Sequence, residues 1–252
     1  MCIRDRLYSG LLDYVYKFAQ ERNYTVETDI ENPQIAIPYK DVNSYILDKI
    51  RPTVDGKEIQ PHEHQIDAIT HAINKERCLL LSPTGSGKSL IIYSLVRYYE
   101  SILPKDKKIL IIVPTTGLVS QMYNDFKDYS SKNKWNVDNK CHVIYAGQDK
   151  VTEKKVVIST WQSLYKMSEK HFSQYGAIFG DECHLFKSKS LTTLMTKLKD
   201  CKYRIGTTGT LDGTHTHKLV VEGLFGGVHN VTTTTKLMEK DLLSKLEIDC
   251  IK

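Results

Sequence analysis

The hydrophobic pattern of the chain changes near residue 62, from which point short apolar runs alternate with longer segments. Short apolar runs bounded by polar residues are typical of buried parallel strands. We expect six such strands, at residues 77–82, 108–113, 142–146, 156–159, 177–180 and 203–206. Helix-length segments lie between several of them, at residues 89–101, 117–129 and 190–198. This alternation predicts an α/β fold, a doubly wound parallel sheet flanked by helices.

The N-terminal part of the chain follows another pattern. Apolar residues recur at helical spacing between Leu11 and Ala19, which predicts an amphipathic helix, and a short extended segment follows near Tyr24. The polar stretch at 51–57 is rich in turn-forming residues. We therefore interpret residues 1–56 as a small, truncated N-terminal accessory α/β domain with its linker, and residues 57–235 as the main domain.

Composition and charge narrow the class of protein. The hydrophobic content of 40% and charged content of 26% are ordinary for a soluble globular protein, and the net charge of +5 is compatible with a polyanionic partner. The six cysteines include no Cys-x-x-Cys pair, which argues against a zinc site and favours a reducing compartment. The apolar runs are too short to span a bilayer. We expect a cytoplasmic protein with no membrane partner.

A glycine-bearing loop follows the apolar run that ends at Leu81 and precedes a helix-length segment. The glycines allow the backbone N–H groups to point at phosphate oxygens, and the loop leads to a helix N-terminus, which favours anions. Lys88 would reach the β- and γ-phosphates, and the Ser89 hydroxyl would ligate Mg²⁺. The pattern predicts an ATP–Mg²⁺ site. Its cofactor-binding residues in the loop would be Thr84, Gly85, Ser86, Gly87, Lys88 and Ser89.

Two carboxylates, Asp181 and Glu182, follow the apolar run at 177–180. They would lie just past the C-terminal end of a buried strand, where open α/β sheets bind ligands. Asp181 would hold Mg²⁺ through water, and Glu182 would orient and deprotonate the attacking water, since phosphoryl transfer depends on positioning and charge neutralisation. His184 completes an Asp-Glu-Cys-His tetrad and, with Lys88, joins the predicted catalytic group.

With these two motifs, the sequence resembles the DExH helicases of superfamily 2. Residues 113–121 and 159–164 resemble motif Ia and a threonine-bearing motif that touches the tracked strand. Residues 208–210 resemble motif III, with Gly209 where alanine is frequent. The segments at 109–116, 160–162, 180–184, 211–213 and 231–238 are similar to the UvsW-type phage recombination helicases. That similarity extends from about residue 11 over nearly the whole chain.

The resemblance implies roles for further residues. Gln65 would read the adenine edge, although its usual aromatic neighbour is missing and histidines stand nearby. Three residues would contact the nucleic-acid backbone, where hydroxyls and amides are suitable phosphate partners. They are Thr115, Thr160 and Gln162. Two residues would couple the ATP site to the nucleic acid, Thr208 and Thr210. Thr115 or Thr160 taken alone could equally be an ordinary helix cap.

The resemblance also implies an ATP-dependent DNA helicase or translocase that remodels branched DNA, or duplex DNA with single-stranded regions. If phage-encoded, it would work in the host cytoplasm. Residues 57–235 would be the first RecA-like domain, and 236–252 a linker and the start of a second one. Because arginines of the second domain complete such ATP sites, we expect this chain to bind ATP–Mg²⁺ but to hydrolyse it weakly.

Other functions compete with this interpretation. The motor subunit of a restriction system shares all these motifs. An RNA helicase is also compatible, because phosphate contacts do not read the 2′-hydroxyl. A nucleic-acid-binding module with a vestigial nucleotide site is a non-enzyme alternative, but Lys88, Ser89, Asp181 and Glu182 are all intact. The tetrad and the Thr-Trp-Gln segment make a small-molecule kinase a poor fit.

Overall fold

The computed structural model describes residues 7–28, 36–145, 149–211 and 215–244, and at 187 and 215–217 the backbone alone. Its described part contains a seven-stranded sheet in the order β5-β6-β4-β7-β8-β3-β9, and every pairing in it is parallel. The strands are β3 (Arg77–Leu81), β4 (Lys108–Val113), β5 (Cys141–Ile144), β6 (Val156–Thr160), β7 (Tyr175–Gly180), β8 (Tyr203–Thr208) and β9 (Val228–Asn230). The prediction of a parallel α/β sheet is confirmed.

The six predicted strands are present and differ at their ends by at most two residues, while predicted residue 146 lies outside the described residues. The expected helices are α4 (Lys88–Ile102), α5 (Thr116–Tyr129) and α9 (Lys189–Lys197). Not predicted were α3 (Glu63–Lys75), α10 (His215–Phe225) and the edge strand β9. Shorter helices are α2 (Tyr39–Tyr45), α6 (Val137–Lys140), α7 (Trp161–Leu164), α8 (Glu169–Phe172) and α11 (Thr234–Glu239).

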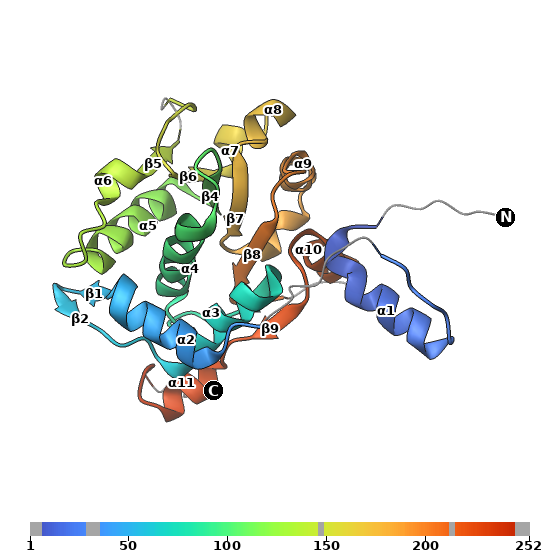
Figure 1. Cartoon of the computed structure of the whole chain (residues 1–252), viewed down its shortest axis with the longest axis horizontal. Helices are drawn as coiled ribbons and strands as arrows, with labels where there is room; N and C mark the ends of the chain where they lie inside the picture. Colours follow the sequence, from blue (N-terminus) through green and yellow to red (C-terminus); the bar gives the residue numbers. More distant parts are fainter. Residues whose placement is uncertain (1–6, 29–35, 146–148, 212–214, 245–252) are drawn as a thin grey trace, which may run out of the picture.

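Both faces of the sheet are covered. Along β4, Ile109 and Ile111 pack into one apolar cluster with α2, α3, α4 and α5, whereas Leu110 and Ile112 pack into a second cluster with α7, α8, α9 and α10. Figure 1 shows the strands through the middle of the molecule, with α4 and α5 on one side and α9 and α10 on the other. Strands buried on both faces have continuous apolar sequences, which is why β4 could be predicted from its sequence.

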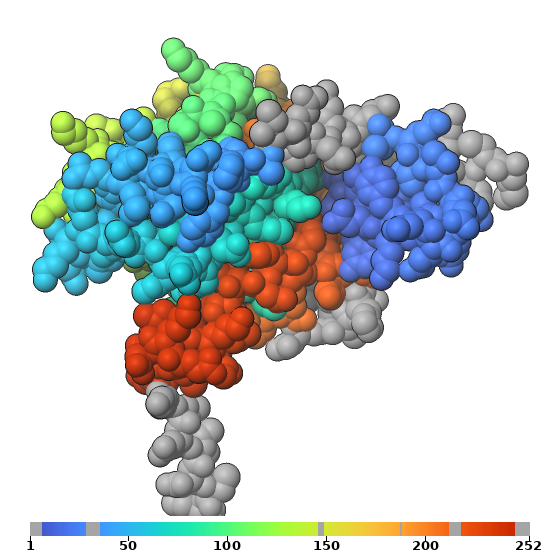
Figure 2. Space-filling view, turned by 60° about the horizontal axis from the view of Figure 1, so that its bottom comes forward, coloured from blue at the N-terminus to red at the C-terminus, as the bar shows by residue number. Residues whose placement is uncertain are grey.

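The N-terminal segment lies against α10. It consists of a 3₁₀ turn (Ser9–Leu11) and α1 (Leu12–Glu21), and of the helix α1 only Ala19 is buried. The Tyr14 hydroxyl donates to Glu222 Oε2 at 2.6 Å, and a Cβ on Gly10 would come within 2.1 Å of the Glu222 carbonyl oxygen. Figure 2 shows this segment, in dark blue, at one edge of the molecule.

Residues 39–58 do not pack with the N-terminal segment. They lie on the face of the sheet that is covered by α3, α4 and α5. Val42 of α2 and Ile46 and Ile50 of a π-helical turn (Ile46–Ile50) belong to that apolar cluster. The polar stretch expected to be a linker forms a hairpin, β1 (Thr53–Val54) and β2 (Lys57–Glu58), turning through left-handed residues at 55 and 56. The domain boundary at residue 56 stays a prediction.

The last described elements of the chain are β9 and α11. After β9, α11 begins at the N-cap Thr233, whose hydroxyl accepts from the Lys236 amide. The expected start of a second domain falls largely at 245–252, outside the described residues. In the part of the chain that the structure describes, no helix combines the length and apolar character needed to cross a membrane.

Candidate functional site

The glycine-bearing loop connects β3 to α4 at the C-terminal edge of the sheet. Gly85 and Gly87 both have φ of +81°, a conformation that L side chains rarely adopt, and Gly87 caps α4. The hydroxyls of Ser82 and Ser86 lie 2.6 Å apart in the buried base of the loop, and the Ser86 amide donates to the Pro83 carbonyl. The loop is therefore braced internally and delivers its backbone to a helix N-terminus, where anions bind.

Helix α3 anchors this loop from the side. The buried Gln65 accepts from the His62 amide at 2.8 Å through Oε1 and donates to the Ser86 carbonyl at 3.0 Å through Nε2. His64 Nε2 lies 3.1 Å from the same carbonyl oxygen, and burial lowers the pKa of His64. A Cβ on Gly87 would lie 2.1 Å from Gln65 Nε2. Gln65 thus lies against the loop, and each end of its amide keeps one further bonding position for a base edge.

Lys88 and the acidic pair meet across the sheet edge. Lys88 Nζ donates to Glu182 Oε1 at 3.1 Å and to the Ser82 carbonyl at 3.4 Å. Asp181 is buried and its Oδ1 accepts from the Thr207 hydroxyl at 2.8 Å. Burial raises the pKa of Asp181, the Thr207 hydrogen bond opposes that shift, and the charge of Glu182 adds to it. Asp181 and Glu182 directly follow β7, which pairs with β8, as expected for functional residues past the ends of parallel strands.

Glu182 has an unusual backbone. Its φ of 50° and ψ of 54° are left-handed, which is uncommon for a residue with a Cβ and costs energy. The chain turns there from β7 into a 3₁₀ helix (Cys183–Lys187). This turn brings the Glu182 carboxylate between Lys88 and His184, whose Nδ1 lies 3.4 Å from Glu182 Oε2. Strain of this kind concentrates at functional sites.

His184 links the tetrad to the end of β8. Its Nδ1 lies 3.0 Å from the Thr208 hydroxyl oxygen, and that hydroxyl donates to the Thr210 carbonyl at 2.8 Å. The residues predicted to couple the two sites therefore contact the acidic tetrad through one hydrogen-bonded chain. The sequence alone gives the order of these residues along the chain but not their contacts.

The Ser89 hydroxyl faces α5. Its Oγ lies 2.8 Å from the Tyr129 hydroxyl oxygen, a hydrogen bond in which either hydroxyl can be the donor. Among the described residues, no group of three or more His, Cys, Asp or Glu side chains could hold a metal ion. A Mg²⁺ at Ser89 and Asp181 would accordingly need phosphate and water as its other ligands, the usual arrangement for this ion.

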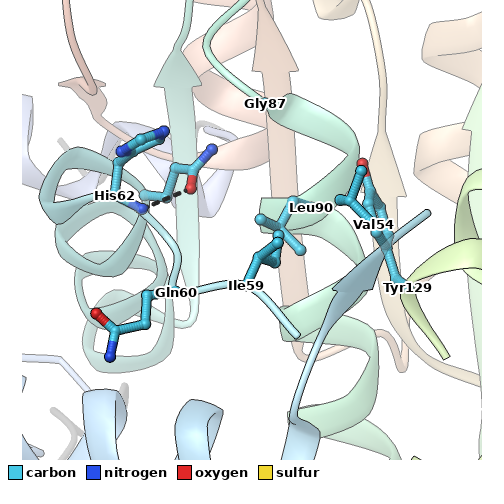
Figure 3. A pocket seen from close by; sticks show the side chains of 8 residues that line it. Val54, Ile59, Gln60, His62, Gly87, Leu90 and Tyr129 are labelled. Atoms are coloured by element: carbon cyan, nitrogen blue, oxygen red, sulfur yellow. Dashed lines mark hydrogen bonds between the residues drawn. The ribbon is translucent and has the colours of Figure 1, made fainter. Parts of the chain in front are cut away.

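A pocket of about 430 Å³ opens beside the loop. Ile59 and Leu90 lie side by side in it, with Tyr129 beyond Leu90 and His62 on the opposite side (Figure 3). The pocket is thus apolar at its centre and bordered by the Gln65 amide, as a planar base requires. Tyr129, which comes from α5, was not singled out from the sequence, because only the neighbours of Gln65 in the chain were considered for an aromatic residue.

The residues expected to meet nucleic acid follow two neighbouring strands. Thr115 is exposed and caps α5, and Thr160 ends β6, in register with Val113 of β4. Thr160 is only 4% exposed and its hydroxyl lies 3.0 Å from that of Ser163. Gln162, on α7, is exposed. In this structure, Thr115 and Gln162 are therefore open to a strand, whereas the Thr160 side chain is enclosed.

Gln162 borders an open pocket of about 490 Å³. Trp161, Tyr165 and two lysines, Lys150 and Lys166, also line it. The Trp161 ring packs edge-on against Tyr165, at 5.8 Å between centroids, and contacts the second apolar cluster, the one that contains Leu110 and Ile112. Lysines beside an exposed amide are suitable for backbone phosphates.

Comparisons with known proteins agree with this geometry. A protein-family model described as "Type III restriction enzyme, res subunit" matches residues 58–213. The ATP-dependent DNA helicase uvsW of Enterobacteria phage T4 is 34% identical over 247 residues, 96% of this chain and 48% of that protein. The DNA 3'-5' translocase XPB2 of Sulfurisphaera tokodaii is 24% identical over 213 residues, 83% of this chain and 42% of that protein. The chain spans about half the length of these relatives.

A solved structure of the UvsW helicase from bacteriophage T4 superposes with a TM-score of 0.79. It is 32% identical to this chain, and the match covers 90% of this chain and 82% of that one. The fold, the loop at 82–89 and the tetrad at 181–184 thus occur together in a sequence whose similarity extends well beyond these motifs. The chain belongs to the superfamily 2 helicases, in the family described as the res subunit of type III restriction enzymes, and is similar to UvsW.

Proposed function

We propose that this chain is the ATP-binding part of an ATP-dependent DNA helicase or translocase. One observation carries the proposal: Lys88, Glu182, His184 and Thr208 form one continuous set of contacts at the edge of the sheet where the glycine loop ends. This set joins a phosphate-binding lysine to a carboxylate that could activate water and to the segment predicted to sense nucleic acid. A glycine turn without a nucleotide would not require that arrangement.

The residues fit ATP and Mg²⁺. Lys88 would leave Glu182 and donate to the β- and γ-phosphates, while the α4 N-terminus would hold them through backbone N–H groups. Ser89 and Asp181 would hold the ion, Asp181 through water. Mg²⁺ would neutralise charge on the phosphate oxygens. Glu182, once free of Lys88, would orient a water molecule and accept its proton.

The pocket beside the loop would take the adenine. Ile59, Leu90 and the Tyr129 ring would pack against the base, and Gln65 would bond its edge. Because Gln65 already bonds Ser86, base binding would be relayed to the phosphate loop through one side chain.

DNA is the proposed partner because of the similarity to a DNA helicase and a DNA translocase. Thr115 and Gln162 would contact its backbone, and Thr160 would hold Ser163 and the start of α7 in place. Branched DNA is the proposed substrate through the resemblance to recombination helicases. A second RecA-like domain, in the half of the relatives' length beyond this chain, would supply the arginines that complete the ATP site.

Nucleic-acid binding by this chain tests the proposal. Fluorescence anisotropy would compare forked, duplex and single-stranded DNA with RNA of the same sequence, with and without a non-hydrolysable ATP analogue and Mg²⁺. We expect forked or duplex DNA to bind more tightly than RNA, and Gln162→Ala to weaken binding. Gln20→Ala, an exposed glutamine on α1, is the matched control. Tighter binding of RNA would favour the RNA-helicase alternative, and no binding of either would contradict a motor.

The restriction-motor alternative is favoured by one finding, the description of the matching family. It predicts a preference for unbranched duplex over forked DNA in the same titration. Equal or tighter binding of unbranched duplex would therefore move the proposal from branched-DNA remodelling to translocation along duplex.

A further inference from the structure

The hairpin at 53–58 is attached to the C-terminal end of α5. Thr53 of β1 is fully buried, and its hydroxyl donates to the Asp128 carbonyl oxygen and lies 2.9 Å from the Ser131 hydroxyl oxygen. In the turn, the Asp55 amide donates to both carboxylate oxygens of Asp128, at 2.9 and 3.2 Å. The hairpin is therefore fixed to α5 at two points, one in β1 and one in its turn.

The apolar side chains of this hairpin segment lie at the pocket beside the phosphate loop. Successive side chains of a strand point to opposite faces, so Val54 points away from the surface that buries Thr53. Val54 is 38% exposed and lines the pocket, and so does Ile59, which directly follows β2. Figure 3 shows Val54 on the same side of the pocket as Tyr129. The other residues of 53–59 are polar or glycine, so both apolar side chains that the segment offers line this pocket.

We propose that the hairpin at 53–58 forms one wall of the base pocket, that Val54 contacts the base of a bound nucleotide, and that Thr53 and Asp128 are positioning residues that hold this wall. The proposal rests on the proposed function, because it assumes that a nucleotide binds at residues 82–89 with its base in this pocket. A valine side chain has no hydrogen-bonding group. It therefore contributes to the affinity for the base and not to the affinity for the phosphates.

Comparing a nucleotide with a ligand that has no base tests this role. A non-hydrolysable ATP analogue and inorganic tripolyphosphate would each be titrated calorimetrically into the chain in the same Mg²⁺ buffer. Val54→Thr keeps a branched side chain, which strands favour, and replaces one methyl group with a hydroxyl. We expect it to weaken binding of the ATP analogue about fourfold, the effect of one buried methyl-sized group, and to leave binding of tripolyphosphate unchanged.

The residues that hold the hairpin are tested with Thr53→Val and Asp128→Ala combined in one chain. These changes remove the hydroxyl and the carboxylate that join the hairpin to α5 and leave Val54 in place. We expect a loss of at least fourfold for the ATP analogue alone, because the wall would no longer be held against the base. Thr53→Ser keeps the hydroxyl and should bind both ligands as the unaltered chain does. Glu58→Ala is the control on the same hairpin, because it removes only the exposed ion pair with Arg51, and it should change neither affinity.

The outcomes separate the two levels of the argument. If Val54→Thr binds the ATP analogue as tightly as Glu58→Ala does, the hairpin does not contact the base, and the proposal is overturned while the nucleotide site stands. If a loss is as large for tripolyphosphate, the changed residue acts on the phosphate loop or on the fold, and the role in base binding is wrong. Full affinity in the double variant would mean that Thr53 and Asp128 do not position the wall. An unaltered chain that binds neither ligand would overturn the proposed function together with this role.

Discussion

Replacing Glu182 with glutamine should separate nucleotide binding from hydrolysis. In the structure, Glu182 Oε1 accepts from Lys88 Nζ at 3.1 Å, and the two side chains are 29% and 16% exposed. This pair is partly withdrawn from water, so solvent weakens it less than it weakens an exposed pair. Lys88 must give up this partner before it can bind a phosphate. The pair therefore competes with the nucleotide.

The size of that competition follows from the contact. A hydrogen bond that involves charged groups contributes about 1.5–3 kcal/mol, and we place the ion pair near the upper end and a lysine–amide bond near the lower. Glu182→Gln should then lower the free energy needed to separate Lys88 from the side chain at position 182 by roughly 1 kcal/mol, which tightens ATP binding about fivefold. The same change removes the group that would accept the proton of the attacking water. Turnover should fall by about 100-fold or more.

Binding would be measured with a fluorescent ATP analogue, and turnover as phosphate release with forked DNA present. Glu100→Gln is the matched control, because Glu100 also pairs with a lysine, Lys140 at 2.7 Å, away from the site. Its nucleotide affinity should not change. A Glu182→Gln variant that binds ATP more weakly than the unaltered chain would refute the competition between Glu182 and nucleotide.

Two further predictions concern stability. Gly226→Ala should lower the free energy of unfolding by roughly 2 kcal/mol, because φ is +131° and a Cβ would lie 2.4 Å from the Arg77 carbonyl oxygen. Urea unfolding measures this loss, with Gly56→Ala as the control, because a Cβ on Gly56 would meet nothing within 4 Å. Equal losses of stability in the two variants would contradict the prediction. Burial, with the charge of His229 stacked at 4.0 Å, lowers the pKa of His71 from 6.5 to about 4, so the unfolded chain binds the proton more readily. Stability should be complete above pH 6.5 and fall as the pH drops toward 4; unfolding curves that are as steep in pH for His71→Gln would refute this assignment.

The elements that the sequence predicts well are those whose signal is local. β4 is an uninterrupted apolar run because both of its faces are buried, and the phosphate loop is specified by residues that adjoin one another. β9 was missed because it has three residues, is only partly buried or exposed, and lies at the sheet edge, so it carries no apolar run. The hairpin at 53–58 was interpreted as a linker because its polar, turn-forming residues indicate only a turn. Nothing in that local sequence indicates that the hairpin packs on α5.

The contacts that organise the site are mostly between distant parts of the sequence. Tyr129 reaches Ser89 across 40 residues and Lys88 reaches Glu182 across 94, and no local pattern encodes either pair. The left-handed backbone of Glu182 is equally invisible in a glutamate. Sequence patterns therefore identified which residues carry the chemistry, whereas the packing of α5 and the turn after β7 determine what those residues touch.

The most direct test of the central claim is the affinity of this chain for ATP in Mg²⁺, measured by isothermal titration for the unaltered chain and for Lys88→Ala. Lys88 is predicted to bind the phosphates, and a charge-assisted hydrogen bond of about 1.5–3 kcal/mol corresponds to a loss of roughly tenfold or more. We expect saturable binding with one site and at least that loss in Lys88→Ala. Equal affinity in the two proteins would mean that nucleotide does not bind at residues 82–89, and that the chain is not the ATP-binding part of a motor.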